Sequence, residues 1–156
     1  MERITPSGPA AWKAAGSETY RTYFLALLAE ALGNEGQIEE GLAVLDEALT
    51  QMHRTAEAFH GAELHRLQGE FLLRRETAQG TCREAEACFR QALTIAQRQQ
   101  AKSLELRAAM SLTRLYQKQG RQAEARPLLA ECFDWFTEGF DTPDLQEAKV
   151  LLDQLA

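Results

Sequence analysis

The sequence has few cysteines, no long apolar run and no apolar leader, and each shortage excludes a class of protein. Its three cysteines are an odd number among 156 residues and do not suggest a disulfide framework. The longest apolar run, YFLALLA from Tyr23, ends at Glu30, far short of the roughly 20 residues of a membrane span. The opening MERITPSGPA lacks the apolar core of a signal peptide. We therefore expect a cytoplasmic protein that does not enter the membrane.

Basic residues are also scarce relative to acids. The chain carries 17 Lys and Arg against 23 Asp and Glu, a net charge of -6. A general nucleic-acid binder needs a basic surface, so the balance argues against that class. The region from Pro127 onward has one lysine, Lys149, whereas residues 102–126 are net basic, and we expect the two regions to neutralise each other. Seven acids lie in the C-terminal region: Glu131, Asp134, Glu138, Asp141, Asp144, Glu147 and Asp153.

Strand-like alternation of Val, Ile, Thr and aromatic residues is missing throughout, so the sequence predicts an all-α fold. The chain also repeats itself. Three segments align: GQIEEGLAVLDEAL from Gly36, GTCREAEACFRQAL from Gly80 and GRQAEARPLLAECF from Gly120. Each has a glycine, then a small residue, a large apolar residue and a second small residue at fixed spacing. These positions are Gly41, Leu45 and Ala48; Ala85, Phe89 and Ala92; and Ala125, Leu129 and Cys132.

A second helical pattern precedes each segment and has a small residue where two helices must approach closely. These residues are Ala29, Gly69 and Thr113, separated by 69 − 29 = 40 and 113 − 69 = 44 positions. One four-residue insertion within RRETAQGT explains the difference. The chain is therefore predicted to hold three helix-turn-helix units with a period of 40, and its glycines are expected to lie in turns.

The pattern of a small residue, a glycine turn and Ala-xxx-Phe-xx-Ala resembles the tetratricopeptide repeat over residues 18–156. The usual period is about 34, so the second helix of each unit would be longer here. The resemblance implies an α-solenoid with repeats at about 18–57, 58–100 and 101–138 and a capping helix at 143–156. Residues 1–17 are expected to be partly disordered and to end in the remnant of a preceding helix. The chain is either a piece of a longer array or a small gene product with an open end.

Three phrases, YFLALLAEALG, AELHRLQGEFLL and GFDTPDLQEAKVLLDQL, are similar to the C-terminal repeat region of bacterial STAND-type signalling ATPases. In such proteins this region often accompanies an adenylate/guanylate cyclase-like or transcription-regulator domain. The resemblance implies a non-catalytic sensing or regulatory arm. No GxxxxGK[ST] phosphate loop occurs in the chain. A free-standing, self-associating adaptor or scaffold is the alternative.

Aromatic residues gather before the last predicted helix. Gly139 is predicted to stop the preceding helix, Thr142 to cap the next and Pro143 to begin it. The rings are expected to fill the joint at which this final helix docks. The four rings are Phe133, Trp135, Phe136 and Phe140.

Residues suited to catalysis or metal binding do not form a pattern. His60 and His65 are five apart, so they would not share a helical face as the pair in HExxH does. Cys82 and Cys88 are six apart, and Cys132 holds a position occupied by alanine in the other units, which favours buried or half-buried thiols. We predict no enzyme activity, no cofactor and no metal.

Tetratricopeptide arrays line their concave face with the first helix of each unit, and the resemblance implies a groove for a protein or peptide partner. Five cations on two adjacent helices of this groove would suit an acidic peptide or a chain terminus. The alternative is a solvated face of ion pairs, because Glu63 with Arg66 and Glu70 with Arg74 are spaced to pair within one helix. The groove positions are Tyr23, Glu30, Glu63, Arg66, Glu70, Arg74, Arg107, Met110, Arg114 and Lys118. An open N-terminal face, predicted to form a homodimer, carries Tyr20, Phe24 and Leu28.

Overall fold

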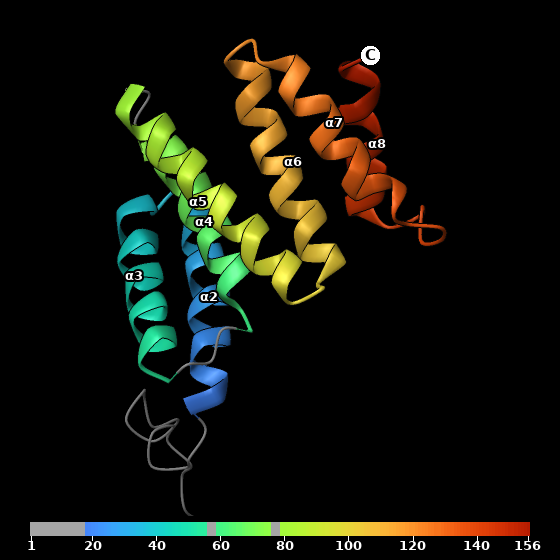
Figure 1. The fold of residues 1–156 in the computed structure, drawn as a ribbon. Helices are drawn as coiled ribbons and strands as arrows, with labels where there is room; N and C mark the ends of the chain where they lie inside the picture. The colour runs from blue at the N-terminus through green and yellow to red at the C-terminus, as the bar shows by residue number, and fades with distance from the viewer. Residues whose placement is uncertain (1–17, 56–58, 76–78) are drawn as a thin grey trace, which may run out of the picture. The chain divides into compact units, whose positions relative to one another are not determined.

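The computed structural model describes residues 18–55, 59–75 and 79–156, and over these ranges it is entirely α-helical (Figure 1). The all-α prediction is therefore confirmed. The predicted N-terminal segment 1–17 lies outside the described residues. The helices are α2 (Glu18–Asn34), α3 (Ile38–Thr55), α4 (Gly61–Arg75), α5 (Gln79–Arg98), α6 (Lys102–Lys118), α7 (Gln122–Asp134) and α8 (Pro143–Gln154).

The chain divides into two compact units, residues 1–60 and 61–156. In the first unit α2 and α3 pack as a hairpin. Ala26 and Ala29 of α2 and Leu45 and Ala48 of α3 are buried in this unit. The stacking of the first predicted repeat on the second stays a prediction.

The second unit contains α4 to α8, and each of these helices packs on the next. The alternate helices α4, α6 and α8 also contact one another in sequence. Helices that pack both on their neighbour and on the helix after it form a layered arrangement, as in helical-repeat proteins. This layering places one face of α4, α6 and α8 together.

The aligned small and large positions within the helices share one environment, because every one of them is buried. Leu45, Phe89 and Leu129 are each fully buried. Gly69 shows why a small residue is needed: a β-carbon there would lie 2.5 Å from Cε1 of Phe89. The ring of α5 therefore lies directly on the backbone of α4.

Three helices end in the same left-handed turn. Gly36 and Gly120 have φ of 80° and 73°, and the amide after each donates to a carbonyl five residues earlier, Gln37 to Leu32 at 2.9 Å and Arg121 to Tyr116 at 2.8 Å. These bonds satisfy carbonyls at the helix end. Gln100 forms the same turn after α5, with φ of 54°.

Gly80 does not lie in a turn, so that prediction is wrong. It belongs to the first turn of α5, which begins at Gln79. The aligned helices α3 and α7 begin two residues after their glycines, at Ile38 and Gln122. In the second predicted repeat the helix therefore extends back over the glycine position.

The start of α8 matches the prediction at Pro143, and Thr142 holds the N-cap position, but its side chain makes no capping hydrogen bond. Thr142 has extended dihedral angles (φ -70°, ψ 145°), and Pro143 is the first residue of the helix. The prediction that Gly139 stops α7 is wrong, because α7 ends at Asp134. Gly139 instead adopts φ of 79° in the following turn, where its carbonyl accepts the Thr142 amide at 2.9 Å and the Thr142 hydroxyl at 2.7 Å.

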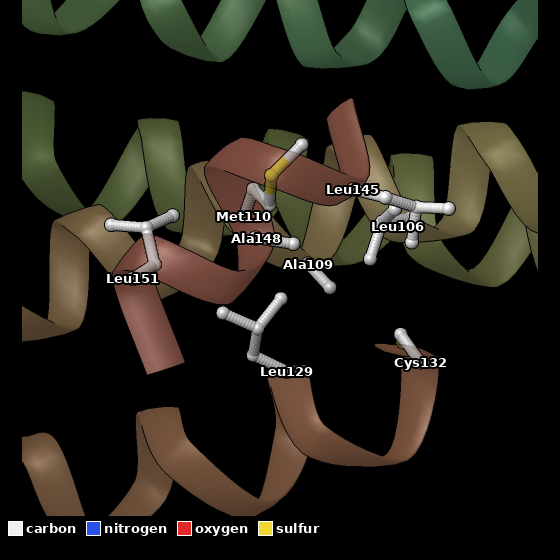
Figure 2. Close-up of a cluster of buried hydrophobic side chains, with 8 residues drawn as sticks. All are labelled: Leu106, Ala109, Met110, Leu129, Cys132, Leu145, Ala148 and Leu151. Carbon is white, nitrogen blue, oxygen red and sulfur yellow. The ribbon is translucent and has the colours of Figure 1, made fainter. Parts of the chain in front are cut away.

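The joint between α6, α7 and α8 is an apolar core in which side chains from all three helices converge (Figure 2). Phe133 and Phe136 pack against it, as predicted, whereas Trp135 and Phe140 are exposed. Trp135 directly follows the last residue of α7, and its ring lies 5.7 Å from Nζ of Lys102. The core residues are Leu106, Ala109, Met110, Leu129, Cys132, Leu145, Ala148 and Leu151.

Candidate functional site

The helices α4, α6 and α8 carry a row of charged side chains, which we call the charged face. One pair lies within α4, where Arg66 donates to both carboxylate oxygens of Glu63, at 2.7 and 3.0 Å. Its other terminal nitrogen lies 3.6 Å from Glu70. The face consists of Glu63, Arg66 and Glu70 on α4, Arg107 and Arg114 on α6, and Asp144 and Glu147 on α8.

Further contacts cross between the helices of the charged face. Arg107 lies 3.0 Å from Glu63 and 3.9 Å from Asp144, so it bridges α4 and α8. Arg114 of α6 pairs with Glu147 of α8. Three of the four arginines predicted to line the groove, Arg66, Arg107 and Arg114, therefore already contact carboxylates. With four carboxylates against three guanidinium groups, the charged face is nearly neutral.

Other predicted groove residues fall in different surroundings. Met110 is 3% exposed and belongs to the apolar core of Figure 2, so its prediction as a groove residue is wrong. Ser111, one position further along α6, reaches the charged face instead and donates to Glu70 at 2.6 Å. Arg74 and Lys118 are exposed, at the C-terminal ends of α4 and α6. Sequence reasoning missed Ser111, because its partner lies 41 positions away.

Tyr23 and Glu30 lie on α2, in the first unit. Tyr23 is exposed, and its ring packs against Phe24 at 5.8 Å and His60 at 5.4 Å between centroids. Glu30 is half-buried. Because the two units are separate compact bodies, the α2 part of the predicted groove stays a prediction.

The outer side of α2 is a stripe of exposed apolar side chains, which we call the α2 stripe. Its inner side packs on α3, so α2 is apolar on two opposite sides. Such a helix is usually covered on both sides. Sequence reasoning found Tyr20, Phe24 and Leu28; the stripe also includes Tyr23 and Leu27, which the helical spacing could have revealed.

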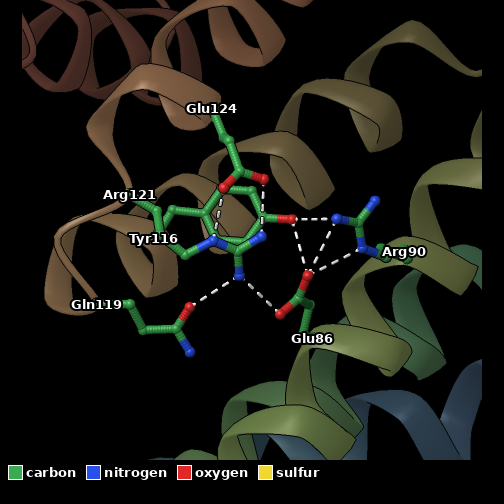
Figure 3. Close-up of polar contacts among 6 residues, drawn as sticks. All are labelled: Glu86, Arg90, Tyr116, Gln119, Arg121 and Glu124. Atoms are coloured by element: carbon green, nitrogen blue, oxygen red, sulfur yellow. Dashed lines mark hydrogen bonds and ion pairs between the residues drawn. The ribbon is translucent and has the colours of Figure 1, made fainter.

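A second polar cluster joins α5 to the turn between α6 and α7 (Figure 3). Glu86 accepts hydrogen bonds from Tyr116 at 2.9 Å and Arg121 at 3.0 Å, and it pairs with Arg90 at 3.0 Å. Arg121 also donates to both oxygens of Glu124, at 2.7 and 2.8 Å, and its guanidinium lies 4.0 Å from the centre of the Tyr116 ring.

The environment of Glu86 changes its acidity. Burial raises the pKa of this carboxyl, but hydrogen bonds from Arg121, Tyr116 and Arg90 lower it by more, so the pKa lies below its ordinary value of 4.5. Glu86 is therefore ionised at neutral pH. Its partner Arg90 lies on the same helix, whereas Tyr116 comes from α6 and Arg121 from the turn before α7, so the cluster links α5 to its neighbours.

Two of the three described cysteines, Cys88 and Cys132, are poorly suited to nucleophilic chemistry. Burial, followed by the charge of Glu105, raises the pKa of Cys132 to about 12, and burial raises that of Cys88 to about 11. Both thiols stay protonated at neutral pH. Glu105 is itself buried and pairs with Lys102 at 2.8 Å. Among the described residues no three His, Cys, Asp or Glu side chains are grouped to hold a metal ion.

Comparison with known proteins gives no match, either to a model of a protein family or to a curated protein sequence. The resemblance to tetratricopeptide arrays and signalling ATPases therefore stays a prediction. Across the described residues, no helix combines the length and the apolar character needed to cross a membrane.

Proposed function

We propose that the chain is a non-catalytic protein-protein interaction module built from tetratricopeptide-like helical hairpins. The observation that carries this proposal is the burial of the aligned small and large helix positions in all three hairpins. Repeated hairpins of this kind cannot bury their apolar faces alone, so neighbours stack and leave an extended surface for partners. We place the partner on the charged face, because there three helices present side chains together.

An acidic partner at this face would have to replace carboxylates that the chain supplies itself. Arg107 and Arg114 are each about one-third exposed, and their partners Asp144 and Glu147 about half exposed. Ion pairs at this level of exposure contribute about 0–1 kcal/mol each. Exchange of these carboxylates for those of a partner is therefore energetically accessible.

In its wider setting, the module would serve as the sensing or regulatory repeat arm of a bacterial signalling ATPase or cyclase-type protein in the cytoplasm. Support for this setting comes from the sequence resemblance over α2, α4 and α8. A continuous reading frame that encodes a phosphate-binding loop upstream of the chain would support it, and a stop codon directly upstream would contradict it.

The second candidate is a self-associating adaptor. It is favoured by the α2 stripe, where Tyr20, Phe24 and Leu28 are each between 45% and 60% exposed. Large apolar side chains grouped on one side of a helix often mark an association surface. A second copy of the chain would then be the partner.

The test of the interaction module is affinity capture with two matched variants. In the first, the face arginines Arg66, Arg107 and Arg114 are changed to glutamate. In the second, three exposed arginines of α5 and α7 are changed to glutamate: Arg83, Arg98 and Arg126.

Both variants change the net charge by the same amount, and circular dichroism confirms that both remain helical. We expect the wild type and the second variant to capture the same partners and the first to lose them. Equal recovery by all three proteins contradicts the charged face as the binding surface.

A further inference from the structure

A pocket of about 250 Å³ opens where the N-terminal end of α6 meets the connection between α7 and α8. Its apolar wall is formed by Leu106, Phe136 and Leu145. Ser103, Glu138 and Asp144 provide polar groups around this wall. The volume is smaller than the roughly 300–1,000 Å³ of small-molecule sites, so the pocket suits one side chain better than a metabolite.

The wall is rigidly supported. Leu106 and Leu145 are buried members of the core shared by α6, α7 and α8 (Figure 2). Phe136 packs against that core. The two leucines come from different helices that contact each other. A side chain that entered the pocket would meet a preformed surface.

The charge at the pocket is negative. Glu138 is exposed and forms no ion pair with any described residue, and the contact of Asp144 with Arg107 is long, at 3.9 Å. The lysine next to Ser103, Lys102, is held by Glu105 at 2.8 Å and does not neutralise this site. The pocket therefore combines an apolar wall with two carboxylates available to a cation.

We infer that this pocket binds an arginine side chain of a protein partner. The apolar stem of an arginine would cover the leucines while its charged head stays near the carboxylates. Its planar guanidinium can stack on an aromatic ring such as Phe136 and pair with both oxygens of a carboxylate such as Glu138. A lysine offers neither the flat surface nor the paired donors.

This inference rests on the proposed function and specifies the chemistry of its partner. Asp144 belongs both to the pocket and to the charged face, so the two surfaces are continuous. The partner surface would carry an arginine next to acidic groups. A partner segment with acidic groups alone would bind to the charged face and leave the pocket empty.

The test is a titration of the isotope-labelled full chain, followed by two-dimensional amide NMR. The probes are two capped tripeptides, acetyl-Leu-Arg-Leu-amide and acetyl-Leu-Gln-Leu-amide. We expect the arginine peptide to shift the amides of Ser103, Gly139 and Leu145 and to bind about tenfold more tightly than the glutamine peptide, because a charged hydrogen-bonded pair is lost. Higher ionic strength should weaken the arginine peptide alone.

Two variants separate the pocket from the overall charge. Glu138→Gln should weaken the arginine peptide about threefold, as expected for an exposed ion pair. Asp153→Asn removes the same charge about 13 Å further along α8 and should leave the affinity unchanged. The amide spectra of both variants also show whether the fold is intact.

Equal shifts from both peptides, or equal effects of both variants, overturn the arginine pocket. The affinity-capture experiment reports on the proposed function separately. If the variant with glutamate at positions 66, 107 and 114 loses its partner while the peptides fail to bind, only the pocket inference is wrong. If the face variant retains every partner as well, the proposed binding surface also fails.

Discussion

The backbone of Gly69 and the ring of Phe89 are in direct contact, with no room for a β-carbon between them. Gly69→Ala should therefore destabilise the second unit by about 1–3 kcal/mol, since overpacking forces the ring or the helix to move. Urea unfolding, monitored by circular dichroism, measures this loss. The control is Gly80→Ala, because Gly80 is helical with no atom within 4 Å of its added β-carbon. The Gly80→Ala variant should be more stable than the wild type by about 0.5–1 kcal/mol.

A second substitution tests whether the ring is the cause. In the background of Gly69→Ala, Phe89→Leu should cost less than it does alone, because the smaller side chain relieves the clash. Additive losses in the double variant would show that Gly69 is needed for another reason.

Gln100 occupies a left-handed turn that glycine occupies at Gly36 and Gly120. Gln100→Gly should stabilise the chain by about 1 kcal/mol, because a side chain in this conformation is strained. Thermal unfolding measures the change. The control is Gln117→Gly, in the last turn of α6, where glycine should destabilise by about 1 kcal/mol. A loss of stability in both variants would contradict strain at Gln100.

The hydroxyl of Thr113 is buried without a hydrogen-bond partner among the described residues. Thr113→Val keeps the shape of the side chain and removes this polar group, so we expect a gain of about 1 kcal/mol in chemical unfolding. Thr94→Val is the matched control, because the Thr94 hydroxyl donates to the Arg90 carbonyl at 3.0 Å. The Thr94→Val variant should be no more stable than the wild type. A loss at Thr113 would show that its hydroxyl is satisfied in solution.

The Glu86 cluster predicts a pH-dependent contribution to stability. Because the pKa of Glu86 is lowered in the folded protein, its stabilising effect is present above the ordinary pKa of 4.5 and is lost as the pH falls through the folded value. Glu86→Gln should therefore cost about 1–2 kcal/mol at neutral pH and little in acid.

Unfolding curves across this pH range make the comparison. Glu84→Gln, at an exposed residue of α5, should leave the stability at neutral pH nearly unchanged. A loss for Glu86→Gln that is equal at all pH values would contradict a role for its ionised form.

The sequence predicted the helices well because the repeat records local geometry. The small residue Gly69 and the large residue Phe89 meet within one hairpin, and Pro143 begins its own helix. Each effect depends mainly on chain that is close in the sequence. The prediction failed at Gly80, next to the insertion between α4 and α5. Here the helix covers a position that is a turn in the other two predicted repeats. The repeat period alone does not show whether an insertion lengthens the turn or the helix.

The candidate site was less predictable. The pairing of Glu63 with Arg66 follows from helical spacing and was expected. The contacts of Arg107 with Glu63 and of Arg114 with Glu147 depend on how α4, α6 and α8 align, over separations of 44 and 33 positions. Exposure of Trp135 depends likewise on where α7 ends.

The α2 stripe provides the final prediction, which concerns self-association. If a second copy covers the stripe, Phe24→Asp should convert a dimer into a monomer, because a carboxylate in an apolar interface loses its hydration. Light scattering after size-exclusion chromatography measures the mass. Val150→Asp is the control, since Val150 is an exposed apolar residue of α8 outside the stripe. A monomeric wild type at high concentration, or loss of the dimer in both variants, contradicts a dimer formed through α2.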